Sequence, residues 1–552
     1  MNKKSLFSKT NIVLVICILL CFATSLYWGY KKEGFHGDEL YSYAFICSTD
    51  EPSVNWGTEE EPYLNEWHTP EYFYDFYTIT PEEKYDVWGV FRVIKGDDHP
   101  FRFYLLLELL ISTISLNSFS KWLGISINLF FLVLTLIALY ILAYKLLKSK
   151  AWAMLVMSFY GFSVGCVSNC IYIRMYMILA FATVFYSLML YLILEQGLSE
   201  SASKWKKYVF LLLHAFAIYY GMTTQCQFAI YCGFLGFLVF FLILFKKKWK
   251  FLLEYTISVI LGLLMTAYVW PETYHDIFAG DDATETAFVD LIFNEFPIAN
   301  LKNFWNVIDA QMFSGYGIIL WGAIIIILVS ACVVFKRAKS YQDRKETLKW
   351  FFVLFSIVTI CLVLFVLAKI APMQIDRYVF NLYPMIAVVM LFLLKSGLDV
   401  LVQSIKWKNL LFAVTVLCCL GIIIVGYVKV GVDYTFIGEA AKVEYMQNSS
   451  DIPVVMITED NRRFFSCVNS YYVKDSDKVF PVKLEDLDEQ FPKINFEVKS
   501  HDRAIVFIDE NLPSHEDILR QFEKGTNLSN AEELFVNDMA TAYLVSGEID
   551  EK

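Results

Sequence analysis

The sequence predicts a mainly α-helical protein: a polytopic transmembrane helical bundle of about 11 spans, with a large first extracytoplasmic loop and a C-terminal soluble α/β domain. Of the 552 residues, 57% are hydrophobic, 17% aromatic and only 19% charged, whereas about a quarter of a typical globular domain is charged. Apolar runs of roughly 20 residues, long enough to cross a bilayer, recur up to residue 429. Residues 433–552 lack such runs and carry about 25 acidic and 12 basic side chains, which accounts for the net charge of -11.

The first span is expected at residues 11–30. Three lysines precede it, which predicts a cytoplasmic N-terminus because positively charged flanks stay inside. The run is too long for a typical signal peptide and lacks a small-residue cleavage site. Further spans are predicted at residues 122–146, 151–169, 172–195, 207–224, 226–245, 251–270, 316–335, 350–368, 379–395 and 409–429.

The loops between these spans support the count. Every second loop is rich in lysine and arginine, as expected on the cytoplasmic side. These loops read KLLKSK, SASKWKK, KKKWK, KRAKSYQDRKETLK and KSGLDVLVQSIKWK. The intervening loops then face outward, together with the C-terminal domain. Residues 101–116 are apolar but short and contain Glu108, so they predict a re-entrant or interfacial helix at the outer face.

Residues 432–552 are predicted to form a small α/β domain, separate from a transmembrane domain of residues 1–431 whose first outer loop covers residues 31–100. Buried strands are expected at 452–460, 503–510 and 541–546, and a helix at 515–525. The domain contains no Gly-rich phosphate loop. The chain also lacks the basic arm that is typical of nucleic-acid binding.

Cysteines and histidines give weaker indications. Cys47 and Cys467 are the two cysteines in polar segments, and a bridge between them is one alternative. Nitrogen and oxygen ligands for a divalent metal are available, without metal-specific spacing, at His36, Asp38, His68 and His99. The sequence therefore requires no cofactor, and a metal stays an open alternative.

Unusual polar residues gather at the predicted outer ends of the spans, although they come from five distant parts of the sequence. They are His36, Asp38 and Glu39, then His99 and Pro100, Arg174 and Tyr176, Gln225 and Gln227, and finally Asp376, Arg377 and Tyr378. Asp38, next to low-dielectric surroundings, can accept a proton from a hydroxyl nucleophile as a general base. Arg174 and Arg377 can hold a phosphate through bidentate hydrogen bonds. This combination suits transfer of a group from a lipid phosphate to a hydroxyl.

A simpler role is open for each of these groups. Asp38 and Glu39 are adjacent acids, which in a loop are often only solvated. Arg174 could be a snorkelling residue at the interface, and Arg377 with its neighbour could only anchor a helix end. The glutamines of the TTQCQ run are more often packed between helices than bound to a ligand.

Four short motifs occur in order along the chain: the acidic pair in GFHGDELYSY, the His-Pro step in DDHPFRFYLLLELL, the Arg-x-Tyr step in IRMYMILA and the Arg-Tyr step in RYVFNLYP. Together they resemble the GT-C superfamily of integral membrane glycosyltransferases, in the bacterial branch related to protein O-mannosyltransferases and to the aminoarabinose transferase of lipid A. The resemblance covers residues 10–430 in layout. Three positions depart from the family pattern: Phe101 replaces a second proline, Glu108 a frequent histidine, and Thr224-Gln225-Cys226 a Thr-His-Tyr step.

The resemblance implies an inverting glycosyltransferase that uses a polyprenyl-phosphate hexose or pentose at the outer face of the cytoplasmic membrane. It implies Asp38 as the catalytic base and Glu39 as a supporting acid. The substrate-binding residues would be His99, Glu108, Arg174, Tyr176, Gln225, Arg377 and Tyr378. The acceptor stays open among wall polymer, lipid and protein, with no nucleic acid involved. Two other functions also stay open: a flippase or transporter of a lipid-linked cell-envelope precursor, and a degenerate member whose C-terminal domain binds wall polymer.

Overall fold

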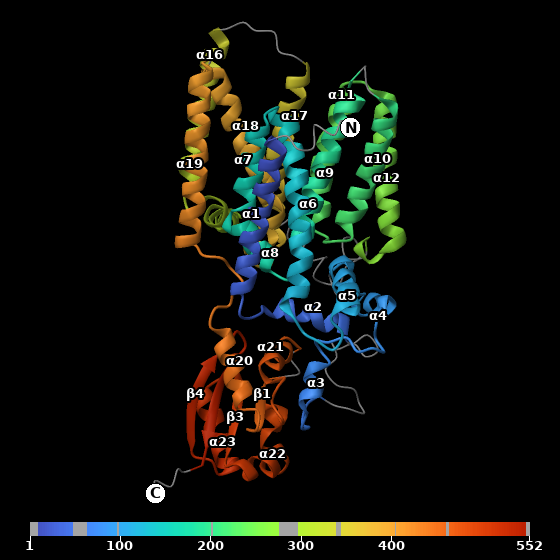
Figure 1. Ribbon diagram of the computed structural model, residues 1–552. Helices are drawn as coiled ribbons and strands as arrows, with labels where there is room; N and C mark the ends of the chain where they lie inside the picture. The colour runs from blue at the N-terminus through green and yellow to red at the C-terminus, as the bar shows by residue number, and fades with distance from the viewer. Residues whose placement is uncertain are drawn as a thin grey trace. The chain divides into compact units, whose positions relative to one another are not determined.

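The computed structural model describes residues 9–47, 63–95, 99–199, 203–274, 296–337, 344–402, 404–459 and 463–547. The chain divides into two compact units. The membrane unit comprises Met1–Tyr30, Asp97–Phe103 and Gly124–Asp433, and the loop unit comprises Lys31–Gly96, Tyr104–Leu123 and Tyr434–Lys552. Figure 1 shows long helices in the first unit, and a sheet with helices on it in the second.

The membrane unit is built from long apolar helices. They are α1 (Lys9–Lys31), α6 (Lys121–Leu147), α7 (Lys150–Gly161), α8 (Val164–Ile171), α9 (Tyr176–Gly197), α10 (Lys204–Met222), α11 (Phe228–Phe245), α12 (Trp249–Val269), α15 (Ile298–Ile308), α16 (Gly317–Arg337), α17 (Arg344–Ile370), α18 (Tyr383–Leu401) and α19 (Ile405–Lys429). Among the described residues, eight helices are long and apolar enough to span a membrane, or ten when each of two bent pairs counts as one span. The chain is therefore a multi-pass membrane protein, as predicted.

The prediction of about 11 spans exceeds this count, and the difference lies in α10. This helix forms where a span was predicted at residues 207–224, and it packs against α9 and α12. Its buried His214 forms a 3.0 Å hydrogen bond with Ser258 of α12. The polar side chains of α10 lower its mean hydropathy below that of a free-standing span. They are tolerated within the bundle because neighbouring helices supply hydrogen-bond partners.

Two helix pairs are sharply bent. The first, α7 and α8, meets at 56°, and Ser163 between them caps the N-terminus of α8. The second pair, Ile298–Phe313 and Gly317–Val333, meets at 83°. It includes the π-helix η3 (Asp309–Phe313). The sequence predicted only a loop ahead of the span at 316–335, so α15 and η3 correct that prediction.

Ion pairs connect helix ends that the sequence assigned to one side of the membrane. Lys145 near the end of α6 lies 2.6 Å from Glu195 of α9. Lys207 at the start of α10 lies 2.5 Å from Glu254 of α12. These pairs agree with the predicted alternation of loops between two ends of the bundle. That the basic end faces the cytoplasm stays a prediction.

The loop unit combines short helices with a five-stranded sheet. Its helices are α2 (Gly37–Cys47), α3 (Pro70–Tyr74), α4 (Val87–Ile94), α5 (Arg102–Ile114), α20 (Glu439–Asn448), α21 (Arg463–Val473), α22 (Leu487–His501) and α23 (His515–Thr526). Its strands are β1 (Val454–Thr458), β2 (Val479–Lys483), β3 (Arg503–Asp509), β4 (Asn530–Val536) and β5 (Ala540–Ser546). The predicted C-terminal α/β domain is thus confirmed.

The sheet has the order β2-β1-β3-β5-β4. Strand β1 pairs in parallel with β2 and β3, whereas β5 pairs antiparallel with β3 and β4. The three predicted strands correspond to β1, β3 and β5, and the predicted helix to α23. The two edge strands, β2 and β4, were not predicted. Apolar side chains of the strands and of α22 and α23 form the core.

The first loop of the chain packs on the C-terminal sheet within the loop unit. His68 forms an antiparallel bridge with Val479 of β2 through backbone hydrogen bonds of 2.8 and 3.0 Å. Trp67 packs against the sheet's hydrophobic core. Buried Tyr77 has its hydroxyl oxygen 2.6 Å from the Cys467 carbonyl of α21. The loop and the C-terminal residues therefore share one interior.

Helix α5 belongs to the loop unit from Tyr104 onward, whereas its first two residues belong to the membrane unit. With 13 residues it extends about 20 Å at 1.5 Å per residue, too short for a hydrocarbon core of about 30 Å. Tyr104 of α5 contacts Phe45 of α2 edge-to-face, and Ser112 accepts a hydrogen bond from the Tyr85 backbone. Position at the membrane surface stays a prediction for this helix. The suggested bridge of Cys47 and Cys467 is wrong, because both thiols are free.

Candidate functional site

The acidic pair of the first loop occupies the first turn of α2, in the loop unit. A helix N-terminus favours negative charge, which helps to explain why two acids begin this helix. The two carboxylates have different surroundings. Glu39 is fully buried and forms an ion pair of 2.9 Å with Lys32. The side chain of Asp38 keeps 22% of its surface exposed, so it is the more accessible of the two acids.

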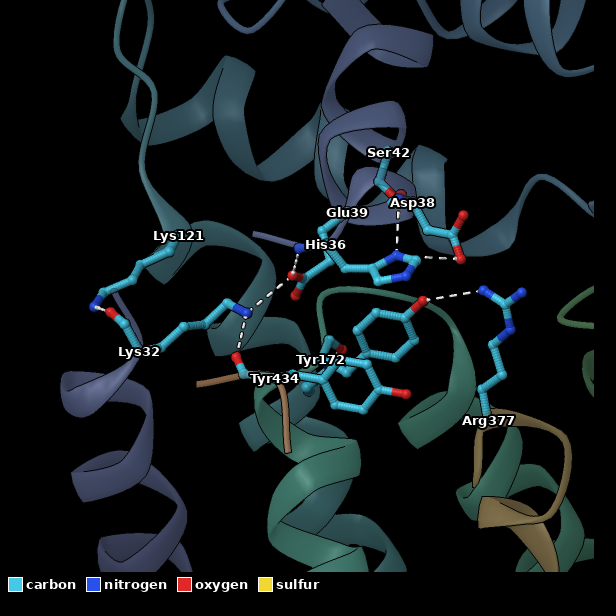
Figure 2. Close-up of polar contacts among 10 residues, drawn as sticks. Lys32, His36, Asp38, Glu39, Ser42, Lys121, Tyr172, Arg377 and Tyr434 are labelled. Carbon is cyan, nitrogen blue, oxygen red and sulfur yellow. Dashed lines mark hydrogen bonds and ion pairs between the residues drawn. The ribbon is translucent and has the colours of Figure 1, made fainter. Parts of the chain in front are cut away.

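His36 orients this turn through its backbone and its ring. Its backbone N–H donates to Glu39 Oε2 at 2.7 Å, and its Nδ1 accepts from the Asp38 backbone N–H at 3.1 Å (Figure 2). That bond requires a lone pair on Nδ1, so the ring proton of neutral His36 lies on Nε2. The Nδ1 to Asp38 Oδ2 distance of 3.6 Å is too long for a hydrogen bond. The hydrogen bond of the ring therefore goes to the backbone of Asp38, and its carboxylate lies within ion-pair distance of the ring.

The membrane unit brings together four of the predicted residues from two distant segments. We call Tyr172, Arg174, Tyr176, Arg377 and Tyr378 the arginine cluster. Tyr172 stacks on Tyr176, with ring centroids 5.8 Å apart and planes at 5°. Arg377 donates from Nη1 to the Tyr172 hydroxyl at 3.5 Å (Figure 2), and its guanidinium lies 5.6 Å from the Tyr378 ring centre. Arg174 is 3% exposed, and its backbone N–H donates to the Tyr172 carbonyl at 2.8 Å.

A buried amide that the sequence analysis missed holds the turn that carries Arg377. Gln311 of η3 donates from Nε2 to Asp376 at 2.8 Å and to Asp433 at 2.7 Å. Its Oε1 accepts from the Tyr383 hydroxyl at 2.8 Å. Burial and the nearby charge of Asp376 raise the pKa of Asp433. The only sequence signal was a single glutamine near a helix end that also carries Asp309, and such glutamines are also common in plain packing.

A second cationic group of the membrane unit, Arg102, lies close in sequence to the predicted residue His99 and contacts the turn that carries Gln225. Arg102 donates from Nε and Nη2 to Thr223 Oγ1 at 3.1 and 2.5 Å. Its guanidinium also lies 4.2 Å from the ring centre of Tyr220. Gln225 itself accepts a 2.9 Å hydrogen bond from the next backbone N–H. Arg102, close to the His-Pro motif in sequence, thus contacts the Thr-Thr-Gln turn through Thr223. It was missed because aromatic residues surround it in the sequence.

Glu108 lies in the interior of the loop unit. Its carboxylate accepts a 2.8 Å hydrogen bond from Ser112 one turn along α5, and burial raises its pKa. His68 stacks on Tyr72, and its Nε2 lies 2.8 Å from the Tyr63 carbonyl. Across the described ranges, no three or more His, Cys, Asp or Glu residues gather closely enough to hold a metal ion. A substrate contact of Glu108 stays a prediction.

Comparison with solved structures identifies the fold. The chain matches ArnT from Cupriavidus metallidurans bound to undecaprenyl phosphate with a TM-score of 0.52, at 10% identity over 97% of both chains. The apo state of ArnT gives the same values. The oligosaccharyltransferase AglB from Archaeoglobus fulgidus, in complex with an inhibitory peptide and a dolichol-phosphate, matches at a TM-score of 0.47 and 10% identity over 89% of this chain and 69% of AglB.

Comparison of sequences gives no match. No family model matches the chain, and no curated protein does. The likeness to ArnT therefore rests on structure, and at this identity it establishes the fold. The predicted architecture, a transmembrane helical bundle followed by an α/β domain, is confirmed, and it has the fold of ArnT.

Proposed function

We propose that this chain is a membrane glycosyltransferase. It moves a hexose or pentose from a polyprenyl-phosphate donor to an acceptor hydroxyl at the outer face of the cytoplasmic membrane. The observation that carries the proposal is the ArnT-like fold over 97% of both chains, since ArnT was crystallised with undecaprenyl phosphate bound. A fold alone does not define a reaction, so the residue-level argument rests on Asp38 and the arginine cluster.

The reaction is a single in-line displacement. The acceptor oxygen forms a bond to the anomeric carbon while the bond from that carbon to the phosphate oxygen breaks, which inverts the configuration. Asp38 takes the proton of the acceptor hydroxyl, and the polyprenyl phosphate leaves with the bonding electron pair. One base is sufficient for this chemistry, in contrast to the two carboxylates of a retaining glycosidase.

The developing charge on the phosphate calls for fixed cations. Arg377 donates to the Tyr172 hydroxyl, and the buried Arg174 lies two residues after Tyr172 in the same segment. In this proposal both guanidinium groups face the phosphate, and they stay charged at any relevant pH. Preorganised donors of this kind stabilise a departing anion more than water does. Tyr378 would support Arg377, whose guanidinium lies 5.6 Å from its ring centre, and Tyr176 would support Tyr172, on which it stacks. His99, Gln225 and Glu108 complete the proposed substrate-binding set. The proposed orientation places the N-terminus in the cytoplasm and the C-terminal domain outside the membrane.

The test is sugar transfer by the full chain reconstituted in liposomes. Undecaprenyl-phosphate hexoses and pentoses, labelled in the sugar, are supplied with a cell-envelope extract as acceptor. We expect Asp38→Asn to lower kcat by about 100-fold or more, the usual contribution of a general base. The control is Asp451→Asn, because Asp451 is an exposed acid of the same unit, 62% exposed and paired with Arg503.

Two outcomes would contradict the proposal. Unchanged transfer by Asp38→Asn would remove Asp38 as the base. Absence of transfer with every donor, together with movement of labelled lipid from one leaflet to the other, would instead identify a flippase or transporter of a lipid-linked precursor.

A further inference from the structure

Lys32 and Glu39 form an ion pair that is completely enclosed. Both side chains are 0% exposed and their charged atoms lie 2.9 Å apart. Burial lowers the pKa of Lys32, and the nearby Glu39 acts against this shift. Such a pair is often no more stabilising than apolar side chains of the same volume, because two charges must leave water. Stability alone therefore gives a weak reason for Lys32 at this position.

The hydrogen bonds of the pair lead to Asp38. Glu39 Oε2 accepts from Lys32 Nζ and also from the His36 backbone N–H at 2.7 Å (Figure 2). His36 Nδ1 then accepts from the Asp38 backbone N–H at 3.1 Å. Each of these contacts fixes one more residue of the first turn of α2. The direction of the Asp38 side chain follows from this turn, because its Cα–Cβ bond is set by the backbone.

The other side of Lys32 contacts the segment Tyr434–Gly438, which we call the C-terminal strap. Lys32 Nζ donates to the Tyr434 carbonyl at 2.7 Å and lies 4.8 Å from the Phe436 ring centre. The strap is in turn held by Glu33, whose N–H donates to the Thr435 carbonyl at 2.7 Å and whose carboxylate accepts from the Gly438 N–H at 2.6 Å.

Two aromatic residues of the strap adopt an unusual backbone conformation. Tyr434 has φ of 64° and Phe436 has φ of 50°, in the left-handed region that bulky residues rarely occupy. Strained backbone persists where its surroundings fix it, and it is concentrated at functional sites. The contacts of Lys32 and Glu33 with the strap provide this fixation.

We propose that Lys32 is a positioning residue for sugar transfer. It joins the C-terminal strap to Glu39, and through Glu39 and His36 it holds Asp38 in the orientation that accepts the proton. This inference rests on the proposed function of Asp38. The Lys32 side chain is 0% exposed, which keeps it from direct contact with sugar or phosphate. We therefore expect its removal to lower the rate of the chemical step and to leave donor binding in place.

The test compares Lys32→Met and Lys32→Arg in the liposome transfer assay. Methionine retains an apolar stem but cannot donate, so we expect kcat to fall about 10- to 100-fold, the usual effect of a displaced catalytic group, with the donor KM changed less than about twofold. Arginine can reach both the Glu39 carboxylate and the Tyr434 carbonyl, so it should restore most of kcat. Lys493→Met is the control, since Lys493 pairs with Glu66 at 2.9 Å on the surface of the same unit.

A charge-reversed variant, Lys32→Glu with Glu39→Lys, separates positioning from ion-pair stability. It keeps an attractive pair, but a lysine at 39 cannot accept from the His36 N–H and a glutamate at 32 cannot donate to Tyr434. We expect thermal stability to be restored relative to Lys32→Glu alone, with kcat still low. Full kcat in the reversed variant would overturn the inference.

Failure of this inference and failure of the proposed function give different results. Wild-type kcat in Lys32→Met, with Asp38→Asn inactive, would refute positioning by Lys32 while Asp38 stays the base. Activity in Asp38→Asn would refute the base whatever Lys32 does. Should Lys32→Met not fold, Lys32→Arg decides: arginine can keep both hydrogen bonds of Lys32, so a folded Lys32→Arg whose kcat is lowered 10-fold or more would overturn the inference.

Discussion

The docking of the first loop on the C-terminal residues predicts the effect of Tyr77→Phe. The Tyr77 hydroxyl oxygen lies 2.6 Å from the Cys467 carbonyl and 2.6 Å from Ser470 Oγ, and the residue is 0% exposed. Phenylalanine keeps the ring in place and removes only the hydroxyl. A buried hydrogen-bonding group left without its partner costs about 1–3 kcal/mol, so we expect the free energy of unfolding of the loop unit to fall by about that amount.

Thermal unfolding of the purified chain in detergent measures this loss. For a unit of about 200 residues, each kcal/mol corresponds to about 2–4 °C in Tm. The control is Tyr74→Phe, three residues earlier, because the Tyr74 hydroxyl bonds the Asp475 carboxylate at 2.8 Å on the surface. Its Tm should stay within about 2 °C of wild type, since exposed substitutions change stability by about 0.5 kcal/mol or less.

A double-mutant cycle supplies the refuting result. If the Tyr77 hydroxyl contacts Ser470, the loss of unfolding free energy in the double variant should differ from the sum of the losses in Tyr77→Phe and Ser470→Ala by about 0.5 kcal/mol or more. Additive losses, or a Tm of Tyr77→Phe equal to that of Tyr74→Phe, would show that this loop does not dock on α21 as described.

Two further variants test other parts of the interior. Burial raises the folded-state pKa of Glu108 above 4.5. The stability that its protonated form contributes is therefore present at low pH and lost as pH rises through that pKa. Glu108→Gln should gain Tm relative to wild type as the pH is raised from 4 to 8, and a difference in Tm that stays constant would contradict this. A Cβ at Gly124 would lie 2.0 Å from Ile173 Cγ2, so Gly124→Ala should lose about 1–3 kcal/mol, whereas Gly421→Ala, with open space around it, should be neutral or slightly stabilising in the same melts.

Much of the fold could be predicted because hydrophobic runs are long and regular. Strands β1, β3 and β5 were predicted from apolar runs that the structure buries. The edge strands were not, for different reasons. β2 contains Pro481, which usually argues against a strand and is tolerated here at the sheet edge. β4 is mostly exposed on both faces, so its sequence shows no alternation of apolar and polar residues.

The acidic turn could be located from the sequence, but the difference in burial between its two acids could not. Asp38 and Glu39 are adjacent, and nothing in their sequence indicates that one is buried and the other accessible. That difference depends on Lys32, which in the sequence is one of two lysines at the end of an apolar span and looks like an interfacial residue. It also depends on the Tyr434 carbonyl, 402 residues away. Every residue has a backbone carbonyl, so the amino-acid sequence does not indicate which one accepts the hydrogen bond.

The same separation has a consequence for the order of synthesis. Lys32 leaves the ribosome 402 residues ahead of its backbone partner, and at about 5–20 residues per second this interval lasts about 20–80 s. During that time Lys32 can pair with Glu39 but lacks its second acceptor, the Tyr434 carbonyl. The first loop can reach its final form only when the last membrane helix has been inserted and the residues beyond it are translated. A nascent or truncated chain that ends before Tyr434 therefore carries Asp38 without the support that orients it.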